Sequence, residues 1–570
     1  MTSILRLNVN FITVTIFELF KFDGGGRDLS AKDCPKGVDR RWYVVAAAAV
    51  ALLFLTSHVI SFMIENVNET VPGDAVRPLL FGLLASASLV LSLIFGRHAK
   101  KISLLGATFF YVVFYFSLLQ YSSPTGFLYG LTQEYLGVTV RHGVLGLVVL
   151  IVLTIVPFLL FLRLGLDRSL LLVGTFAVGS AGTALVNYTM SHAVVGDEDV
   201  SLQPPPVDLA AAKPPFPDIF YIVPDRYGSV SALRHLFDFD NGPFVEELRR
   251  RGFYVADEAF ANYPQTSWSL ASSLNMAFLD HLTEKYGRNS ANQFPLFRLI
   301  ENNSVQSILR QLGYRYVHTA SQWRGTLWNA HADVNFSAVS RTERVLGLTE
   351  VEIMLMNMTP LGAIVRRIDH GAYPGCERVR GQIDFIKNEG GRSQPTFLFA
   401  HLMMPHEPIF LDENAQCIEP TSYERLHWRD FGRAFIGYLK FGNAALLDII
   451  DHQLRNNPNG MIFIIQADEG PYPPSLREKR DSYTSLSAPD LAAKLGILNA
   501  IYIPGSDYRR FHSSLSPINN WRLVLSHLLR RDLPLAEDRS YVFTDERHIF
   551  EFRDVTDRLR RIQSGERRTR

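Results

Sequence analysis

Residues 218–227 read Asp-Ile-Phe-Tyr-Ile-Val-Pro-Asp-Arg-Tyr, and this stretch decides the fold that the sequence predicts. The run from Ile219 to Val223 is rich in β-branched and aromatic residues, which is typical of a buried strand. Pro224 has no N–H to donate, so it ends the ladder. Asp225 is then the first side chain free to project from the carboxyl end of the strand, where open α/β sheets bind their ligands.

A second stretch, residues 461–467, has the same form. It reads Met-Ile-Phe-Ile-Ile-Gln-Ala, and Asp468, Glu469 and Gly470 follow directly. Two apolar strands that both end in acidic residues would bring three carboxylates to one edge of a sheet. Carboxylates placed in this way usually hold a cation. A simple turn is the alternative for each acid taken alone, because Asp is common in turns.

The composition limits the class of protein. A chain of 570 residues is long for one domain. Its formal net charge of +1 creates no global field toward nucleic acid, so we predict no nucleic-acid partner. The three cysteines, Cys34, Cys376 and Cys417, form no CxxC pair, which gives no support to a zinc-finger or thioredoxin-type site.

Five apolar segments precede the more charged part of the chain, and each is close to the roughly 20 residues that cross a bilayer. They are Trp42–Ile64, Val76–Gly96, Ser103–Leu119, Gly143–Leu164 and Ser169–Met190. Buried core helices are the alternative, but five such runs with few internal charges favour membrane spans. Basic residues gather before the first span and in the second connection, whereas the first and third connections carry acids. Because basic loops stay in the cytoplasm, we predict a cytoplasmic N-terminus.

These patterns divide the chain into five parts. They are a cytoplasmic N-terminal segment (1–41), a five-helix transmembrane domain (42–190), a stiff proline-rich linker (191–217), an extracytoplasmic α/β domain (218–548) and a basic, frayed tail (549–570). The predicted location is the cell membrane, with the large domain in the periplasm or outside the cell. Strand-like and helix-like runs alternate after residue 218, which predicts a sheet with helices on its faces. The helical runs are 244–251, 295–312, 423–454 and 517–529, and further strand-like runs are 314–318, 395–402 and 497–503.

Thr266 stands at the predicted start of a helix, in the stretch Tyr-Pro-Gln-Thr-Ser-Trp at 263–268. A hydroxyl at a helix start faces unpaired N–H groups and the positive end of the helix dipole. This setting suits a simple N-cap, which is the favoured interpretation for the residue taken alone. It equally suits an alkoxide nucleophile or a bound phosphate.

Further side chains that could take part in chemistry follow two predicted strands. His401 and His406 lie at the end of the run 395–402, where one of them could bind a phosphate oxygen or protonate a leaving group. Packed or surface histidines are the alternative. Trp323 beside Arg324 suits stacking on a sugar or glycerol together with pairing to phosphate, with ordinary packing as the alternative.

Taken in order, these features resemble the alkaline phosphatase/sulfatase superfamily. Within it, the chain looks like the membrane-anchored lipoteichoic acid synthases and phosphoethanolamine transferases, over about residues 42–545. The resemblance implies an α-helical membrane domain followed by a sulfatase-like α/β domain. It makes Asp225 the first acidic metal ligand and Asp468 the Asp of a late Asp-His pair. It makes Thr266 the nucleophile and a further metal ligand.

The resemblance also implies roles for substrate-binding residues. His406 falls near the histidine that contacts the substrate phosphate, and we group His401 with it. Trp323 and Arg324 lie roughly where the family has an aromatic residue and an arginine that bind the substrate. With the predicted topology Cys376 and Cys417 share the oxidising side and flank the run 395–402, so we predict a disulfide between them, with two free thiols as the alternative.

The chain departs from the family pattern at Glu469, where the family has His. A third carboxylate makes the site all oxygen, which favours a single manganese or magnesium ion over zinc. It could also mean that the chemistry has changed or been lost. No Cys/Ser-x-Pro-x-Arg motif surrounds Thr266, which disfavours sulfate ester hydrolysis.

The predicted function is transfer of a phospho-head-group, of the phosphoglycerol or phosphoethanolamine type. The donor is a membrane phospholipid, the acceptor is a glycan or lipid of the outer surface, and Thr266 carries the group as phosphothreonine. One alternative is a metal-dependent phosphoester or sulfate ester hydrolase that uses water at the same site. Another is a catalytically silent binding protein. The head group, the acceptor and the oligomeric state stay open.

Overall fold

The structure is a computed structural model of the chain. It describes residues 76–80, 202, 207–321, 323–339, 341–349, 352, 374–422, 426–478, 482–545 and 548–568. Of the five predicted spans only residues 76–80 are included, and they are helical. Among all described residues, none of the helices has both the length and the apolar character that a bilayer crossing requires. The predicted membrane domain otherwise lies outside the described residues.

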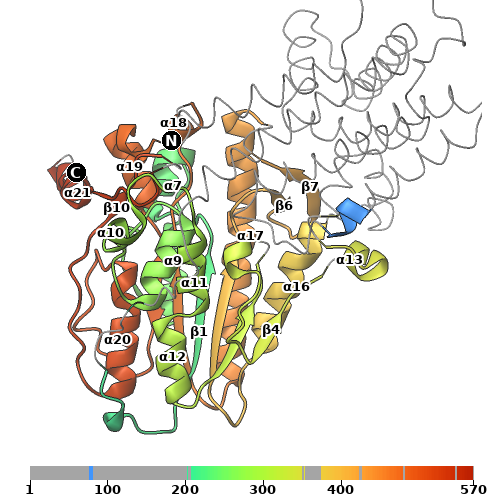
Figure 1. Cartoon of the computed structure of the whole chain (residues 1–570), viewed down its shortest axis with the longest axis vertical. Coiled ribbons are helices and arrows are strands. Elements are labelled where there is room, and N and C mark those ends of the chain that lie inside the picture. The colour runs from blue at the N-terminus through green and yellow to red at the C-terminus, as the bar shows by residue number, and fades with distance from the viewer. Residues whose placement is uncertain are drawn as a thin grey trace, which may run out of the picture.

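A seven-stranded sheet forms the centre of the domain, in the order β2-β9-β8-β1-β5-β3-β4 (Figure 1). The five strands from β8 to β4 run parallel, whereas β9 is antiparallel to β8 and β2 is antiparallel to β9. Every residue of β1, β5 and β8 is buried, as expected for parallel strands covered on both faces. The strands are β1 Asp218–Pro224, β2 Tyr254–Val255, β3 Arg315–Thr319, β4 Val334–Phe336, β5 Thr396–Leu402, β8 Met461–Gln466 and β9 Asn499–Tyr502.

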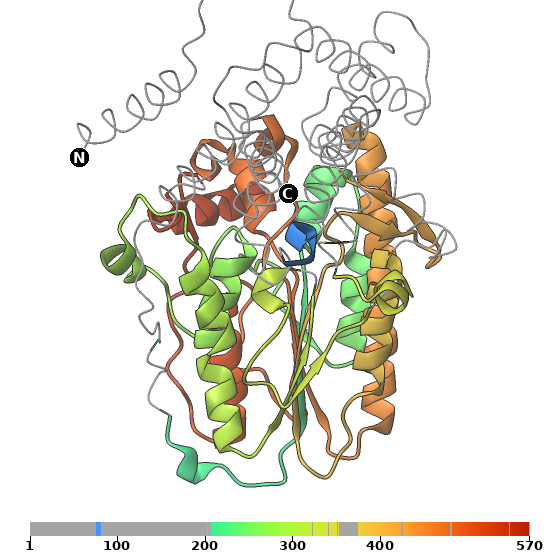
Figure 2. The same cartoon turned by 45° about the vertical axis from the view of Figure 1, so that its right-hand side comes forward.

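Helices cover both faces of this sheet. One face carries α9 Thr266–Asn275, α11 Phe294–Glu301, α12 Ser304–Gln311 and α20 Pro517–Leu529, and the other carries α8 Gly242–Arg250, α16 Pro374–Asn388 and α17 Trp428–Asn456 (Figures 1 and 2). Their apolar residues and those of the strands form one continuous hydrophobic core. The α/β architecture predicted from the alternating pattern is therefore present.

The remaining elements lie mostly around the ends of the strands. The α-helices are α7 Val230–Phe237, α10 Leu282–Tyr286, α13 Arg341–Leu346, α18 Pro474–Glu478, α19 Ala488–Leu495 and α21 Thr556–Arg568. The 3₁₀ turns are η2 Leu209–Ala211, η3 Arg324–Thr326 and η4 Tyr483–Ser485. Two hairpins stand apart from the main sheet, β6 Ile409–Leu411 with β7 Cys417–Thr421, and β10 Tyr541–Val542 with β11 Arg553–Asp554. The carboxyl ends of the parallel strands face the side where α7, α18 and α19 lie (Figure 1).

Two parts of the chain differ from the sequence prediction. The run 295–312 forms two helices, because Asn303 caps a new one by accepting a hydrogen bond from the Gln306 N–H. Residues 549–568, which we predicted to lie in a frayed tail, are packed against the domain, since Phe550 and Leu559 are buried and α21 packs against α19. The α/β domain therefore continues beyond residue 548 to the end of α21, because these apolar residues complete its core.

A disulfide joins Cys376 in α16 to Cys417 at the start of β7, with a Cα–Cα distance of 5.8 Å. It connects a helix that covers the sheet with the hairpin that follows His406 in the chain. The segment that carries His406 is thus tethered at both ends, by β5 on one side and by the disulfide-linked hairpin on the other.

Candidate metal centre and active site

Strand pairing explains how Asp225 and Asp468 come together. In the parallel pair β1–β8, Ile222 lies opposite Ile465. Asp225 and Asp468 each follow three residues later, so the register brings the two acids level at the carboxyl edge. Both side chains are buried, with 2% and 0% of their surface exposed. The arrangement follows from two apolar strands that are direct neighbours in the sheet.

The neighbouring strand β5 adds His401. It lies opposite Val223 of β1, and Val223 and Asp225 point to the same face because side chains alternate along an extended chain. His401 Nε2 lies 3.3 Å from Asp225 Oδ2 and 4.0 Å from Asp468 Oδ2. In the described part of the chain these three residues form a group whose possible ligand atoms all lie within 4.8 Å of one another.

This group fits a divalent metal ion. Three of its atoms, Asp225 Oδ1, Asp468 Oδ2 and His401 Nε2, are buried and have no hydrogen-bond partner among the described residues. Each such atom costs about 1–3 kcal/mol if it is left unpaired, and two buried carboxylates repel each other. A cation among them would offset both costs. Carboxylate and imidazole together are ligands used for zinc, manganese and iron, so the set supports a divalent ion without selecting one.

Glu469, which we predicted as a further metal ligand, is not among the three residues of this group. Its Oε1 lies 3.0 Å from Arg226 Nε and its Oε2 lies 2.7 Å from Lys494 Nζ. Both oxygens therefore face cations of the protein. His401, which we predicted to bind substrate, lies among the ligand atoms instead. Because an imidazole nitrogen takes part, the site is not all oxygen, and the argument for manganese or magnesium over zinc no longer holds.

Thr266 lies at the same edge. It is the first residue of α9, and the preceding Gln265 is the N-cap and makes no side-chain capping bond. The Thr266 hydroxyl lies close enough to Asp468 to lower the pKa of that carboxyl, so it is near the acids of the group. The first N–H groups of a helix have no partner within it, which leaves this end suited to an anion such as phosphate.

A hydrogen-bond chain holds the ring of His401. Thr326 Oγ1 lies 2.9 Å from His401 Nδ1, and Ser321 Oγ lies 2.6 Å from Thr326 Oγ1. The ring of Trp323 packs edge to face on the imidazole, with centroids 5.8 Å apart. Trp323 therefore supports the histidine, whereas the guanidinium of Arg324 lies 4.4 Å from the centre of the Phe294 ring. The predicted substrate roles of Trp323 and Arg324 stay predictions.

The charges around the acids act in opposite directions. Burial raises the pKa of Asp225, but His406, His401 and Arg226 outweigh burial and hold that pKa below its ordinary value. Burial raises the pKa of Asp468, and the neighbouring acids raise it further. Burial and Arg226 lower the pKa of His406, which is half-buried beside Asp225. The charged form of Asp225 is thus strongly favoured, whereas Asp468 needs a nearby positive charge to favour its charged form.

The sequence did not indicate two residues of this region, Arg226 and Lys494. Arg226 directly follows Asp225. A positively charged residue next to an acid at the end of a strand was a signal that could have marked it as part of the site. Lys494 lies in α19, fully buried, far along the chain from every predicted site residue. No local pattern marks it.

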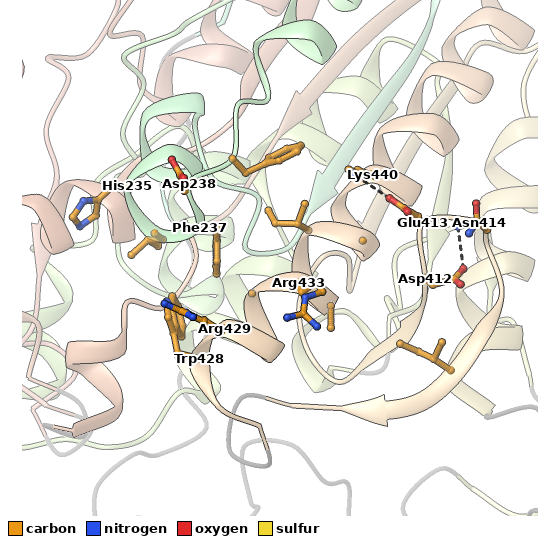
Figure 3. Close-up of a pocket in the computed structure, with 17 residues that line it drawn as sticks. His235, Phe237, Asp238, Asp412, Glu413, Asn414, Trp428, Arg429, Arg433 and Lys440 are labelled. Atoms are coloured by element: carbon orange, nitrogen blue, oxygen red, sulfur yellow. Dashed lines mark hydrogen bonds and ion pairs between the residues drawn. The ribbon is translucent and has the colours of Figure 1, made fainter.

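A surface pocket of about 720 Å³ lies elsewhere, between the end of α7, the β6–β7 turn and the first half of α17 (Figure 3). Trp428 stacks on Phe237 there, with ring centroids 5.2 Å apart. The pocket includes none of the candidate site residues.

No protein-family model matches the chain, and no curated protein matches it by sequence. Solved structures that match include phosphoethanolamine transferases, sulfatases and a protein of the alkaline phosphatase superfamily, which are the groups that the sequence resembles. The periplasmic domain of EptC from Escherichia coli is 13% identical, with 60% of this chain and 94% of that chain covered and a TM-score of 0.38. The lipooligosaccharide phosphoethanolamine transferase EptA from Neisseria meningitidis is 11% identical, with 89% and 98% covered and a TM-score of 0.36.

The alkaline phosphatase superfamily protein from Vibrio parahaemolyticus is 12% identical, with 59% of this chain and 75% of that chain covered and a TM-score of 0.34.

Proposed function

We propose that this chain transfers a phospho-head-group from a membrane phospholipid to a hydroxyl of an outer-surface glycan or lipid. One observation carries the proposal: a helix-start hydroxyl, Thr266, lies next to Asp468 in a buried group that fits a divalent ion. A nucleophile held against a metal site at a helix N-terminus suits attack on a phosphorus atom.

In the first half of the reaction, Thr266 Oγ attacks the phosphorus of the donor lipid. The bond between phosphorus and the diacylglycerol oxygen breaks, and the head group stays on Thr266 as a phosphothreonine ester. Asp468 takes the hydroxyl proton, because it lies beside Thr266 and because burial and the neighbouring acids raise its pKa. His406 in its protonated form gives a proton to the diacylglycerol oxygen. A divalent ion held by Asp225, His401 and Asp468 would screen the negative charge on the phosphoryl oxygens.

In the second half, a hydroxyl of the acceptor attacks the phosphorus of the phosphothreonine, and the bond between phosphorus and Thr266 Oγ breaks. Neutral His406 takes the acceptor proton, and Asp468 returns its proton to Thr266 Oγ. The acceptor and the head group are proposed only as classes, the head group being of the phosphoglycerol or phosphoethanolamine type. The five predicted spans would keep the catalytic domain outside the cytoplasm and close to the lipid donor. A freely diffusing phosphatase would have no need of such an anchor.

Mass spectrometry of Thr266 after incubation with mixed membrane lipids tests this proposal. The full chain should carry an adduct on the peptide that contains Thr266, and the adduct mass should identify the head group. Thr266→Ala should carry none, while Thr421→Ala, at a half-buried threonine of the β6–β7 hairpin, should react as the parent does. Product formation without an adduct on Thr266 would overturn the mechanism.

Assays with and without an added glycan acceptor separate transfer from hydrolysis at the same site. A transferase should release diacylglycerol faster when the acceptor is present and should form a head-group ester of the acceptor. Release of free head-group phosphate at the same rate in both assays would show that water is the acceptor, and the chain would then be a hydrolase.

A further inference from the structure

A buried ionic cluster lies beside the metal-binding group and has no role in the mechanism above. Glu469 pairs with Arg226 at 3.0 Å and with Lys494 at 2.7 Å. Arg226 Nη1 also lies 2.6 Å from Glu407 Oε1. The two cations lie against the ring of Tyr472, the Arg226 guanidinium 4.1 Å and Lys494 Nζ 3.8 Å from its centre.

The local structure explains why these residues meet. Arg226 has a φ of 60°, which side chains other than glycine adopt rarely, and its backbone N–H lies 3.3 Å from Asp468 Oδ1. The turn after β1 is thus fixed against the turn after β8. A Cβ atom on Gly470 would lie only 2.3 Å from the Ala493 carbonyl oxygen, so only glycine lets α19 come close enough to place Lys494 beside Glu469.

The charges of the site divide into two balanced groups. Arg226 and Lys494 carry two positive charges, and Glu407 and Glu469 carry two negative ones. Asp225 and Asp468 are left with two negative charges, which one divalent ion neutralises. Without Lys494, the cluster would be net negative and would repel a phosphate dianion.

The side chains of Arg226 and Lys494 differ in how much of their surface is exposed. The side chain of Lys494 is fully buried, whereas 14% of the Arg226 side chain is exposed. An arginine has five N–H donors, and its pairs with Glu469 and Glu407 occupy Nε and Nη1. The guanidinium lies close enough to Asp225 and His406 to change the pKa of both. Arg226 is therefore the cation that can reach a group bound in front of the acids.

We propose that Arg226 binds an oxygen of the phosphoryl group that is transferred, and that Lys494 is a positioning residue which neutralises Glu469 so that the cluster around Arg226 does not become net negative. This rests on the proposed function, since it assigns a phosphate ligand to the same site. It also explains the glutamate at position 469, because that residue holds the side chains of Arg226 and Lys494 in place of ligating the metal.

Calorimetric titration of the purified full chain with inorganic phosphate, with zinc or manganese in excess, tests the proposal. Arg226→Met should weaken phosphate binding about 10- to 100-fold, because a charge-assisted hydrogen bond is lost. The affinity for the metal, measured separately against a chelator, should stay unchanged. Arg251→Met is the matched control, since Arg251 pairs with two acids, Glu247 and Asp451, on α8 and α17.

A pair of variants tests the positioning role of Lys494. Lys494→Met should weaken phosphate binding while metal binding persists, because the cluster of Arg226, Glu407 and Glu469 then carries a net negative charge. Adding Glu469→Gln to Lys494→Met should restore phosphate binding, which a merely structural lysine would not allow. Thermal unfolding of each variant first shows whether it is folded, and only folded variants are compared for phosphate affinity.

The outcomes separate this inference from the proposed function. Unchanged phosphate affinity in Arg226→Met, or loss of metal binding together with phosphate binding, would overturn the inference. An adduct on Thr266 in the parent chain would then still support the transferase. Phosphate binding that depends on Arg226 in a chain that never forms the adduct would support the inference and refute the transferase.

Discussion

Replacing Thr326 by valine tests whether the hydrogen-bond chain behind His401 prepares this histidine to hold a metal. Valine has nearly the shape of threonine but no hydroxyl, so the packing is kept and the 2.9 Å contact with His401 Nδ1 is lost. For Nε2 to offer its lone pair to a metal, Nδ1 must carry the proton and donate it to an acceptor. Thr326 Oγ1 is that acceptor, and Ser321 in turn contacts Thr326.

Loss of such a partner behind a metal-binding histidine lowers metal affinity by about 10- to 100-fold, which equals about 1.4–2.7 kcal/mol of binding free energy. Competition with a zinc chelator, followed by the free-zinc signal, measures this on the purified full chain. Thr326→Ser keeps the hydroxyl and should restore most of the affinity.

Thr396→Val is the matched control, because Thr396 lies in the same strand as His401 and its hydroxyl is buried without a hydrogen-bond partner among the described residues. This control should bind zinc as the parent does. Unchanged affinity in Thr326→Val, or a loss that serine fails to restore, would refute the role of the hydroxyl.

Three further predictions concern the site and the stability of the domain. Thr266→Ala should abolish transfer yet keep most of the zinc affinity, because Asp225, His401 and Asp468 remain; a loss of zinc comparable to Asp468→Ala would contradict this. Replacing both Cys376 and Cys417 by alanine should lower the free energy of unfolding by about 3–4 kcal/mol, since the bridge spans 41 residues of sequence; an unchanged denaturant midpoint would show that the bridge does not constrain the unfolded chain. Burial lowers the pKa of His318 to about 4 from its ordinary value of 6.5, so the unfolded chain binds a proton first as the pH falls. The stability that neutral His318 contributes is complete above pH 6.5 and is lost as the pH falls toward 4, by up to about 3 kcal/mol. Denaturation at pH 7.5 and 4.5 should show a smaller acid loss in His318→Gln, and an equal loss in both chains would contradict the prediction.

The sequence by itself determined which elements reach the site and which acids they carry. Asp225 and Asp468 each follow an apolar run long enough for one strand, and the carboxyl ends of parallel strands share an edge. Thr266 was predictable in the same way, because helix starts have recognisable residues and a known chemistry. These patterns are local, so they can be recognised without knowing which parts of the chain pack together in the fold.

Only the tertiary structure decided which side chains join the candidate metal site and which face protein cations. His401 lies in the candidate metal site because β5 pairs with β1 in a register that sets it opposite Val223, and such pairing is not encoded in either strand alone. Glu469 faces protein cations because α19 brings Lys494 against it from a distant part of the chain. A carboxylate pairs with the positive charge that lies nearest to it. For Glu469 the packing of two elements far apart in sequence sets the distance to that charge.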